Sequence, residues 1–283
     1  MGALNFTKMH GLGNDFVVID SRGKALQLPE DRIRALADRH RGIGFDQIMI
    51  IGDSDNADAG LVMANADGAA VGACGNGTRC VGAVLLDELQ LDVVSIETAT
   101  GIVTASRGPN GTTTVDMGPA RLAWQEIPLA QAMDTLHLRL EIETDAGPLR
   151  DPVGVNMGNP HAVFFVDDPH RYDLGRFGAR LERDALFPEG ANISLAAVTG
   201  DDIALRVWER GAGLTLACGT AACATLVAAV RRGLCGREAS VHLPGGALGI
   251  VWRATDDHVL MSGPVAISFS GTVDPDRLEL VPR

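Results

Sequence analysis

The chain carries one stretch of sequence twice, and this internal repeat restricts the folds that it can adopt. Residues 60–75, GLVMANADGAAVGACG, align without a gap with residues 204–219, ALRVWERGAGLTLACG, at an offset of 144. Further matches recur at an offset of 145: Gly13-Asn14 with Gly158-Asn159, Gln47-Ile48 with Asn192-Ile193, and Gly118-Pro119 with Gly263-Pro264. Matches in the same order at nearly one spacing predict two homologous halves, each with one copy of the same apparatus.

The two halves show the same order of predicted elements. Apolar strands at 16–20 and 162–167 precede helices predicted over 29–40 and 172–183. The first helix has Ile33, Leu36, Ala37 and His40 on one face, and Gly42 can stop it. Paired strands follow at 47–51 and 61–65, and at 192–198 and 204–209. A cysteine then leads into an apolar helix, 73–89 or 216–233, before alternating strands over 94–107 or 239–253. A helix that is apolar nearly all round must be buried, which favours strands around it.

Composition excludes several classes of protein. The net charge is −12 without a basic cluster, which argues against a nucleic-acid partner. The longest apolar run, 221–230, is too short to span a membrane, and the first residues lack the pattern of a signal peptide. The cysteines number five, an odd count without C-x-x-C spacing, which predicts thiols in a reducing cytoplasm and no structural zinc site.

Cys74 and Cys218 occupy equivalent positions, each at the start of a predicted helix. The first N–H groups of a helix have no acceptor within it, and the helix dipole makes that end positive. We therefore expect each thiol to ionise more readily than an ordinary cysteine, whose pKa is about 8.5. An anionic group can bind the N–H groups of residues 75–76 or 219–220. Glycine after each cysteine lets a ligand approach the backbone closely.

Two thiols placed in this way suggest transfer of a proton between the faces of a carbon atom. If the halves face each other about a pseudo-twofold axis, one thiol removes the α-proton of an amino acid while the other protonates the opposite face. Donors at the helix starts stabilise the enediolate that forms, by about 3–4 kcal/mol each. An isolated cysteine is more often a small buried apolar residue. That interpretation holds for Cys80, Cys223 and Cys235, which lack this context.

Seven motifs extend from Met9 to Cys223: MHGLGNDFVVID, HRGIGFDQIMII, NADG…ACGNGTRC, GNPH, LFPEGANI, WERGAG and ACGTAACA. Together they resemble the diaminopimelate epimerase family. The resemblance implies an α+β fold of two pseudo-symmetric domains, 1–118 plus 265–283 and 119–264, each a β-barrel-like sheet around a central helix. It implies interconversion of LL- and meso-diaminopimelate in lysine and peptidoglycan precursor biosynthesis. It also implies a cytoplasmic homodimer that needs neither pyridoxal phosphate nor metal.

The resemblance implies roles for individual residues at the reacting centre. Cys74 and Cys218 would transfer the proton, and His161 and Glu209 would tune the two thiols. Phe269 would lie at a dimer contact, although a core position is the simpler explanation for a phenylalanine. The reacting carboxylate would bind Gly75, Asn76, Gly219 and Thr220.

A second set of residues would hold the distal, non-reacting amino-acid group of the substrate. A distal carboxylate suits a bidentate arginine, and a distal ammonium suits glutamate and amide oxygens. Taken singly, these residues have simpler explanations. Turns and caps explain most single Asn and Gln residues. A structural role is as common as a functional one for a lone histidine such as His161, and Glu209-Arg210 resembles a surface ion pair. The implied set is Asn14, Gln47, Asn65, Asn159, Asn192, Glu209 and Arg210.

Departures from the expected motifs affect the loops and leave the proposed catalytic groups in place. They are Ala69-Ala70, Asp184, Leu214 and Ala221. Three other functions remain open from the sequence: a racemase of another amino acid on the same fold, a non-catalytic amino-acid-binding protein, and a redox thiol pair. Binding alone does not need two thiols, and a redox pair usually has C-x-x-C spacing.

Overall fold

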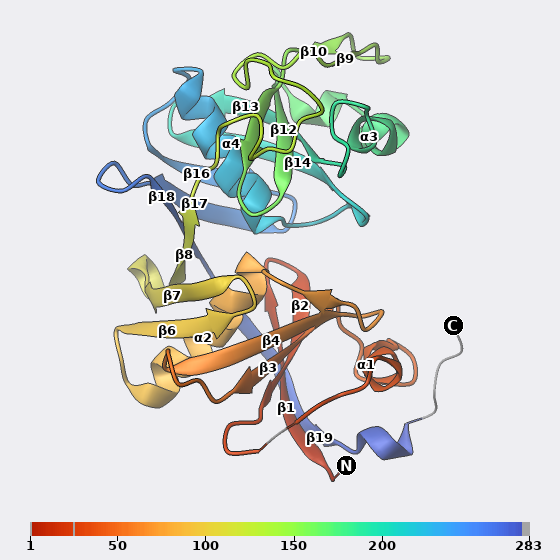
Figure 1. Cartoon of the computed structure of the whole chain (residues 1–283), viewed down its shortest axis with the longest axis vertical. Coiled ribbons are helices and arrows are strands. Elements are labelled where there is room, and N and C mark those ends of the chain that lie inside the picture. Colours follow the sequence, from red (N-terminus) through yellow and green to blue (C-terminus); the bar gives the residue numbers. More distant parts are fainter. Residues whose placement is uncertain (1, 25, 279–283) are drawn as a thin grey trace. The chain divides into compact units, whose positions relative to one another are not determined.

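The chain divides into two compact units, Met1–Val115 with Gly263–Arg283, and Asp116–Ser262 (Figure 1). The computed structural model describes residues 2–24 and 26–278. The two-domain α+β class predicted from the sequence is confirmed. The boundaries predicted from the sequence, 118/119 and 264/265, lie a few residues farther along the chain.

The first unit combines two α-helices with a sheet of mixed direction. Its strands pair in the order β19, β1, β2, β3, β4, β6, β7, β8, with β5 also on β4. The β2–β3 and β4–β6 pairs are parallel, and the others are antiparallel. The bounds are β1 Leu4–Gly11, β2 Asn14–Asp20, α1 Glu30–Ala37, β3 Gln47–Gly52, β4 Ala59–Asn65, β5 Ala70–Val71, α2 Gly75–Leu89, β6 Val93–Thr98, β7 Gly101–Arg107, β8 Thr113–Pro119 and β19 Ala266–Val273.

The second unit repeats this plan element by element. Strands β11, β12, β13, β14, β16, β17 and β18 pair in that order, with β12–β13 and β14–β16 parallel. These are the counterparts of β1, β2, β3, β4, β6, β7 and β8, so the predicted duplication is confirmed in the fold. The bounds are β11 Val153–Asn156, β12 Pro160–Phe165, α3 Leu174–Glu182, β13 Asn192–Thr199, β14 Asp202–Glu209, β15 Gly213–Leu214, α4 Gly219–Arg231, β16 Glu238–Leu243, β17 Gly246–Trp252 and β18 His258–Gly263.

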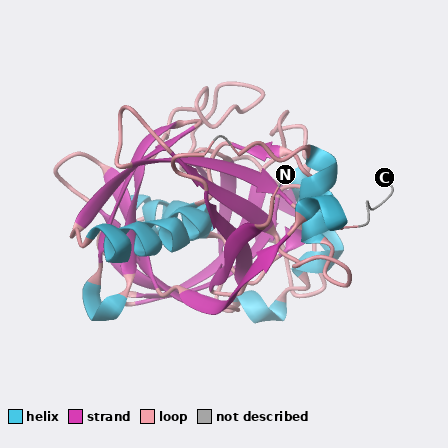
Figure 2. Ribbon diagram, turned by 90° about the horizontal axis from the view of Figure 1, so that it is seen from below, coloured by secondary structure: helices cyan, strands magenta, loops and turns pink. Residues whose placement is uncertain are grey.

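The helix after each cysteine is the buried centre of its unit. Helix α2 contacts β1, β2, β3, β6 and β7, whereas α4 contacts β11 to β14, β16 and β17. In α4, Gly219 and every residue from 221 to 229 are buried, because small Ala and Gly side chains let the strands approach closely. Figure 2 shows strands on several sides of a long helix, whereas the shorter helices lie at the periphery of the view. The prediction of a helix that the strands surround is confirmed.

Equivalent turns lead into the two copies. Gly13 lies between β1 and β2 with φ +88°, and Gly158 lies between β11 and β12 with φ +94°. An L-residue rarely adopts such values, whereas glycine does so at little cost. Each turn therefore places the following asparagine, Asn14 or Asn159, at the start of the next strand.

Each unit has its own apolar core away from the central helix. In the first unit Phe6, Val17, Ile33 and Ile48 belong to one such cluster. In the second unit a larger cluster also includes residues 127–149, among them the short pair β9 Glu141–Ile142 and β10 Leu149–Arg150. This segment precedes β11 and extends the second unit beyond the repeat.

The predicted bounds of the helices were wrong in detail. Helix α1 ends at Ala37, where we expected position 40, and His40 is exposed beyond its end. The cause is Asp38, whose carboxylate accepts the N–H groups of His40 and Arg41 at 2.8 Å each and so competes with the helical bonds. The central helices begin at Gly75 and Gly219, so that each cysteine is the N-cap residue.

Within the described part of the chain, none of the helices combines the length and apolarity needed to cross a membrane.

Candidate active site

The sheet of each unit gathers polar side chains at one edge. Parallel β2 and β3 begin at this edge and antiparallel β4 ends there, and Gln47 pairs directly with Asn65. In the second unit, β12 and β13 begin and β14 ends at the corresponding edge, where His161 pairs with Asn192. We call these two groups of residues half-site 1 and half-site 2. Half-site 1 comprises Asn14, Gln47, Asn65, Cys74, Gly75 and Asn76, and half-site 2 comprises Asn159, His161, Asn192, Glu209, Arg210, Cys218, Gly219 and Thr220.

Hydrogen bonds among amides hold half-site 1 together. Gln47 Nε2 donates to Asn65 Oδ1 at 2.9 Å, and Asn76 Nδ2 donates to Asn14 Oδ1 at 3.4 Å. Asn76 is the second residue of α2 and is buried. The carbonyl oxygen Gln47 Oε1 is buried with no hydrogen-bond partner among the described residues. An unmet buried acceptor is costly, so this oxygen suits the N–H of a ligand.

Cys74 caps the central helix of the first unit. Its backbone is extended, with φ −148° and ψ 103°, and its Sγ accepts the N–H of Gly77 at 3.4 Å. Its carbonyl oxygen accepts the N–H of Thr78 at 2.8 Å, which is the first helical bond. The N-cap geometry therefore directs the sulfur to the positive end of the helix dipole.

Half-site 2 differs from half-site 1 because it contains charged groups. Asn192 is buried, and its Oδ1 accepts the backbone N–H of Arg210 at 2.9 Å. Glu209 Oε1 accepts the hydroxyl of Thr215, and Nη1 of the exposed Arg210 donates to the carbonyl of Glu189 at 2.9 Å. These contacts differ from the simple surface ion pair of Glu209 with Arg210 that the sequence also allowed.

The surroundings of Cys218 raise the pKa of its thiol. Cys218 is 5% exposed and is the N-cap of α4. Burial raises this pKa well above the usual value, and the carboxylate of Glu209 raises it further. A hydrogen bond from Thr220 has the opposite, smaller effect. The expectation that a helix start makes this thiol more acidic was therefore wrong for Cys218: burial and a neighbouring negative charge outweigh the helix dipole.

His161 is neutral in half-site 2. Burial lowers its pKa to about 3, with a smaller contribution from the positive charge of Arg210. Its Nε2 lies 2.8 Å from Asn159 Oδ1, so that Nε2 carries the proton in this arrangement. Its Nδ1 is buried without a hydrogen-bond partner among the described residues. The ring therefore offers an unmet acceptor.

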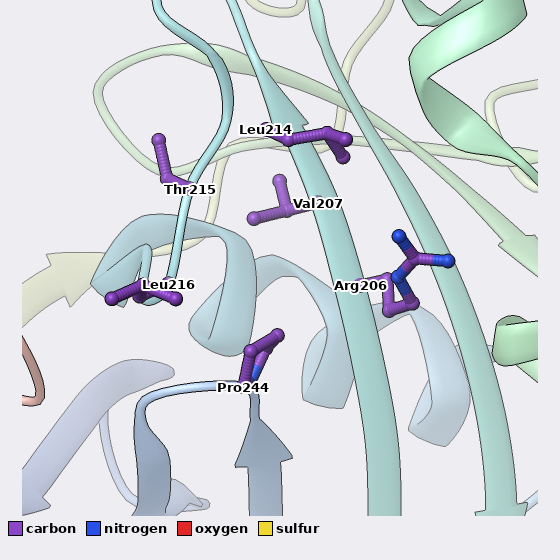
Figure 3. A pocket seen from close by; sticks show the side chains of 6 residues that line it. All are labelled: Arg206, Val207, Leu214, Thr215, Leu216 and Pro244. Atoms are coloured by element: carbon purple, nitrogen blue, oxygen red, sulfur yellow. The ribbon is translucent and has the colours of Figure 1, made fainter.

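Two pockets of the second unit have none of the half-site residues in their linings. No group of three His, Cys, Asp or Glu side chains suited to a metal occurs among the described residues. Figure 3 shows a pocket of about 260 Å³ beside the segment that leads to Cys218. Its lining contains Leu214 and Leu216, both half-exposed, but none of the predicted site residues.

The structure brings most predicted residues into one half-site or the other and places Phe269 apart from both. Phe269 lies on β19, is 49% exposed and packs edge-on against Phe6 with ring centroids 6.0 Å apart, so it is not a core residue. Sequence reasoning missed Arg79 and Asp46, which contact half-site 1, and Glu182, which contacts the turn after Glu209. Arg79 lies within the motif ACGNGTRC and Asp46 within HRGIGFDQIMII, so these motifs could have drawn attention to both residues.

Known proteins resemble this chain over nearly its whole length. The family model described as diaminopimelate epimerase matches residues 6–123 and 153–267 and omits most of the extra segment of the second unit. A diaminopimelate epimerase of Rhodospirillum centenum is 53% identical over 276 residues, which cover 96% of this chain and 93% of the relative. One of Methylorubrum extorquens is 52% identical over 288 residues, with 96% and 95% covered.

Solved structures of other enzymes share the fold at low identity. A phenazine biosynthesis protein of the PhzF family from Bacillus anthracis matches with a TM-score of 0.68 and 16% identity, covering 96% of this chain and 99% of that one. A hydroxyproline epimerase from Agrobacterium vitis, with bound trans-4-hydroxy-L-proline, matches with a TM-score of 0.65 and 17% identity, covering 96% and 94%. These likenesses concern the fold.

Proposed function

This chain belongs to the diaminopimelate epimerase family, and on that premise we propose that it interconverts LL- and meso-diaminopimelate by proton transfer between Cys74 and Cys218. The observation that carries the proposal is the equivalent placement of the two cysteines, each the N-cap of its unit's central helix. Among the equivalent residues of half-site 1 and half-site 2, only these cysteines supply a potential base in both copies.

The reaction needs a base, an acid and stabilisation of the intermediate. One thiolate takes the α-proton, the electron pair moves into the carboxylate as an enediolate, and the other thiol returns a proton to the opposite face. The N–H groups of residues 75–76 and 219–220 bind that carboxylate as its negative charge grows. Because its pKa is raised, Cys218 is the protonated partner before substrate binds. Cys74 is then the base for the direction in which Cys218 is the acid.

The remaining polar groups suit a second amino-acid group at the far end of the substrate. Arg210 can grip a carboxylate with two parallel N–H groups. Acceptors in the two half-sites, including Glu209 Oε1 and Gln47 Oε1, suit an ammonium. A monoamino acid would leave such groups unmet at a cost of about 1–3 kcal/mol each.

The proposal includes conditions of operation and assembly. The chemistry uses thiols and backbone N–H groups, so we propose that neither metal nor pyridoxal phosphate is required and that a reducing compartment such as the cytoplasm keeps the thiols active. We also propose a homodimer. The exposed Phe269 on β19 suits a contact with the same strand of a second copy.

Solvent proton exchange tests the reaction and its mechanism. In heavy water, LL-diaminopimelate should gain deuterium at one α-carbon as it epimerises, whereas Cys74→Ala and Cys218→Ala should each retain less than about one-thousandth of this activity. Cys80→Ala, on the same helix as Cys74 but fully buried, is the matched control and should remain active. Turnover above a few percent in either single variant would refute the two-base mechanism. Faster turnover of proline or lysine than of diaminopimelate would refute the substrate.

A further inference from the structure

Arg79 is a fully buried cation that contacts half-site 1 from within its helix. It lies on α2, and its relative exposure is 0%. Its Nη1 donates to Asn76 Oδ1 at 3.1 Å. The backbone of Gly11 lies so close that a Cβ built there would be 2.6 Å from Arg79 Nη2. A residue with a side chain at position 11 would therefore push the guanidinium away from Asn76.

The contact from Arg79 is the first link of a hydrogen-bond chain across half-site 1. Asn76 Nδ2 donates to Asn14 Oδ1 at 3.4 Å, and Asn14 Nδ2 donates to Asp46 Oδ2 at 2.9 Å. Asp46 is itself held, because Arg39 donates to its Oδ1 at 2.8 Å and the backbone N–H of Asp15 donates to its Oδ2 at 3.1 Å. The chain therefore runs from a cation through two amides to an anion.

The two ends give this chain a single direction. A guanidinium can only donate and a carboxylate can only accept, whereas an asparagine amide can be turned over to exchange its donor and acceptor. With Arg79 at one end and Asp46 at the other, each amide must accept on the arginine side and donate on the aspartate side. Either end alone favours this direction, so loss of one end leaves the other as the sole restraint on the turning of both amides.

The second unit shows that the fold does not require this hydrogen-bond chain. The residue equivalent to Arg79 is Cys223, which is also fully buried in the central helix. Thr220 stands where the first unit has Asn76, and Asn159, the counterpart of Asn14, instead contacts His161. A buried cation is costly to desolvate and is weak evidence for stability. Its presence in one copy alone points to a task at half-site 1.

We propose that Arg79 and Asp46 are positioning residues that fix the amide orientations of Asn14 and Asn76 beside the substrate. Neither touches substrate. They determine which edge of each amide, the N–H or the carbonyl, is presented to it. This inference rests on the proposed function, because that function places Asn14 and Asn76 next to the ligand.

Substitutions at position 79 separate positioning from packing. Lysine keeps a donor-only cation, whereas methionine keeps a long apolar stem without a donor. Positioning predicts that Arg79→Lys retains more kcat/KM than Arg79→Met, which should fall about tenfold or more, the factor for one hydrogen bond to a charged group. If Arg79 served only packing, Arg79→Met would retain more kcat/KM than Arg79→Lys, because methionine is buried without the cost of desolvating a charge. The matched control is Cys80→Ala, next to Arg79 and equally buried, and it should keep its activity.

A double-mutant cycle tests whether the two ends act through one chain. Asp46 is largely exposed, so Asp46→Asn should fold normally even if Arg79→Met proves unstable. Because either end can maintain the direction, the double variant should lose more kcat/KM than the product of the two single losses if both residues orient the same amides. Multiplicative losses, or equal activity of the lysine and methionine variants, would overturn the proposal.

Side-chain amide NMR gives a readout that does not depend on turnover. In the substrate-free protein the ¹⁵N-labelled side-chain amides of Asn14 and Asn76 should both shift in Arg79→Met and in Asp46→Asn, but not in Cys80→Ala. Unchanged signals in the first two variants would overturn the positioning role even if activity falls. If the signals shift in these two variants but the wild-type protein does not epimerise diaminopimelate, the hydrogen-bond chain is supported and the proposed function is rejected.

Discussion

Replacement of Gly178 by alanine should disturb both the stability of the second unit and half-site 2. Gly178 lies on α3 and faces the ring of Trp208, where an added Cβ would be 2.4–2.6 Å from three ring atoms. Trp208 Nε1 donates to Glu182 Oε2 at 2.7 Å, and Glu182 Oε1 accepts the N–H of Gly211 at 3.1 Å. Displacement of the ring would therefore shift the turn that follows Glu209.

The size of the effect follows from opposing contributions. Ordinary contact begins at 3.4 Å, so the ring must move by about 1 Å. Overpacking of this kind costs about 1–3 kcal/mol, and weakening of the Trp208–Glu182 bond adds about 1 kcal/mol. Alanine within a helix stabilises the folded state by up to about 1 kcal/mol relative to glycine. We expect a net loss of about 2 kcal/mol.

Gly175, on the same helix, provides the matched control. A Cβ there would meet only Asp173 Oδ1 at 3.3 Å and Leu214 Cδ1 at 3.4 Å, so alanine should stabilise by up to about 1 kcal/mol. The two variants should differ by about 3 kcal/mol, or roughly 6–12 °C in Tm by calorimetry. Gly178→Ala should also raise KM for diaminopimelate. Melting of both variants within about 2 °C of each other would show that the steric argument is wrong.

Three further predictions concern half-site 2 and the core of its unit. Glu209→Gln removes a negative charge that raises the pKa of Cys218, so the ultraviolet absorbance of the Cys218 thiolate should appear at lower pH than in wild type; an unchanged or higher midpoint would contradict the assigned cause. Arg210→Lys should lower kcat/KM at least tenfold for diaminopimelate, because a point charge cannot reproduce a bidentate grip, and steady-state kinetics with little change would reject the distal site. Thr225→Val should leave stability unchanged or raise it by about 1 kcal/mol in urea unfolding, because the Thr225 hydroxyl is buried without a hydrogen-bond partner among the described residues; a clear loss would indicate an undetected partner.

The repeat made the fold and the equivalent placement of the two cysteines predictable. Alignment of Cys74 with Cys218 placed both at helix starts, and the strand order of one unit predicted that of the other. Helix α1 was overestimated because its apolar period continues to His40, whereas the carboxylate of Asp38 ends the helix by binding nearby N–H groups. An aspartate after the last apolar residue is a local signal that could have been weighed against periodicity.

Electrostatics and buried networks were less accessible to sequence reasoning. The helix dipole predicted a more acidic thiol at Cys218, but the effect of burial depends on how the whole unit packs, and Glu209 becomes its neighbour through the fold. Arg79 is the one arginine of α2, and a charged residue in a helix is ordinarily exposed. The backbone of Gly11 at the end of β1 lies close to its guanidinium, an approach that no pattern along the chain encodes.

The two half-sites descend from one ancestral sequence, yet they now differ in chemical character. Half-site 1 pairs Gln47 with Asn65, whereas the corresponding positions of half-site 2 hold Asn192 and Glu209. In a homodimer of single-copy subunits every mutation appears twice, so such a difference could not arise. Two copies within one polypeptide can differ in this way, because a mutation changes only one of them. In diaminopimelate a second stereocentre makes the two faces of the reacting carbon chemically inequivalent, and two unlike copies can adapt to them separately.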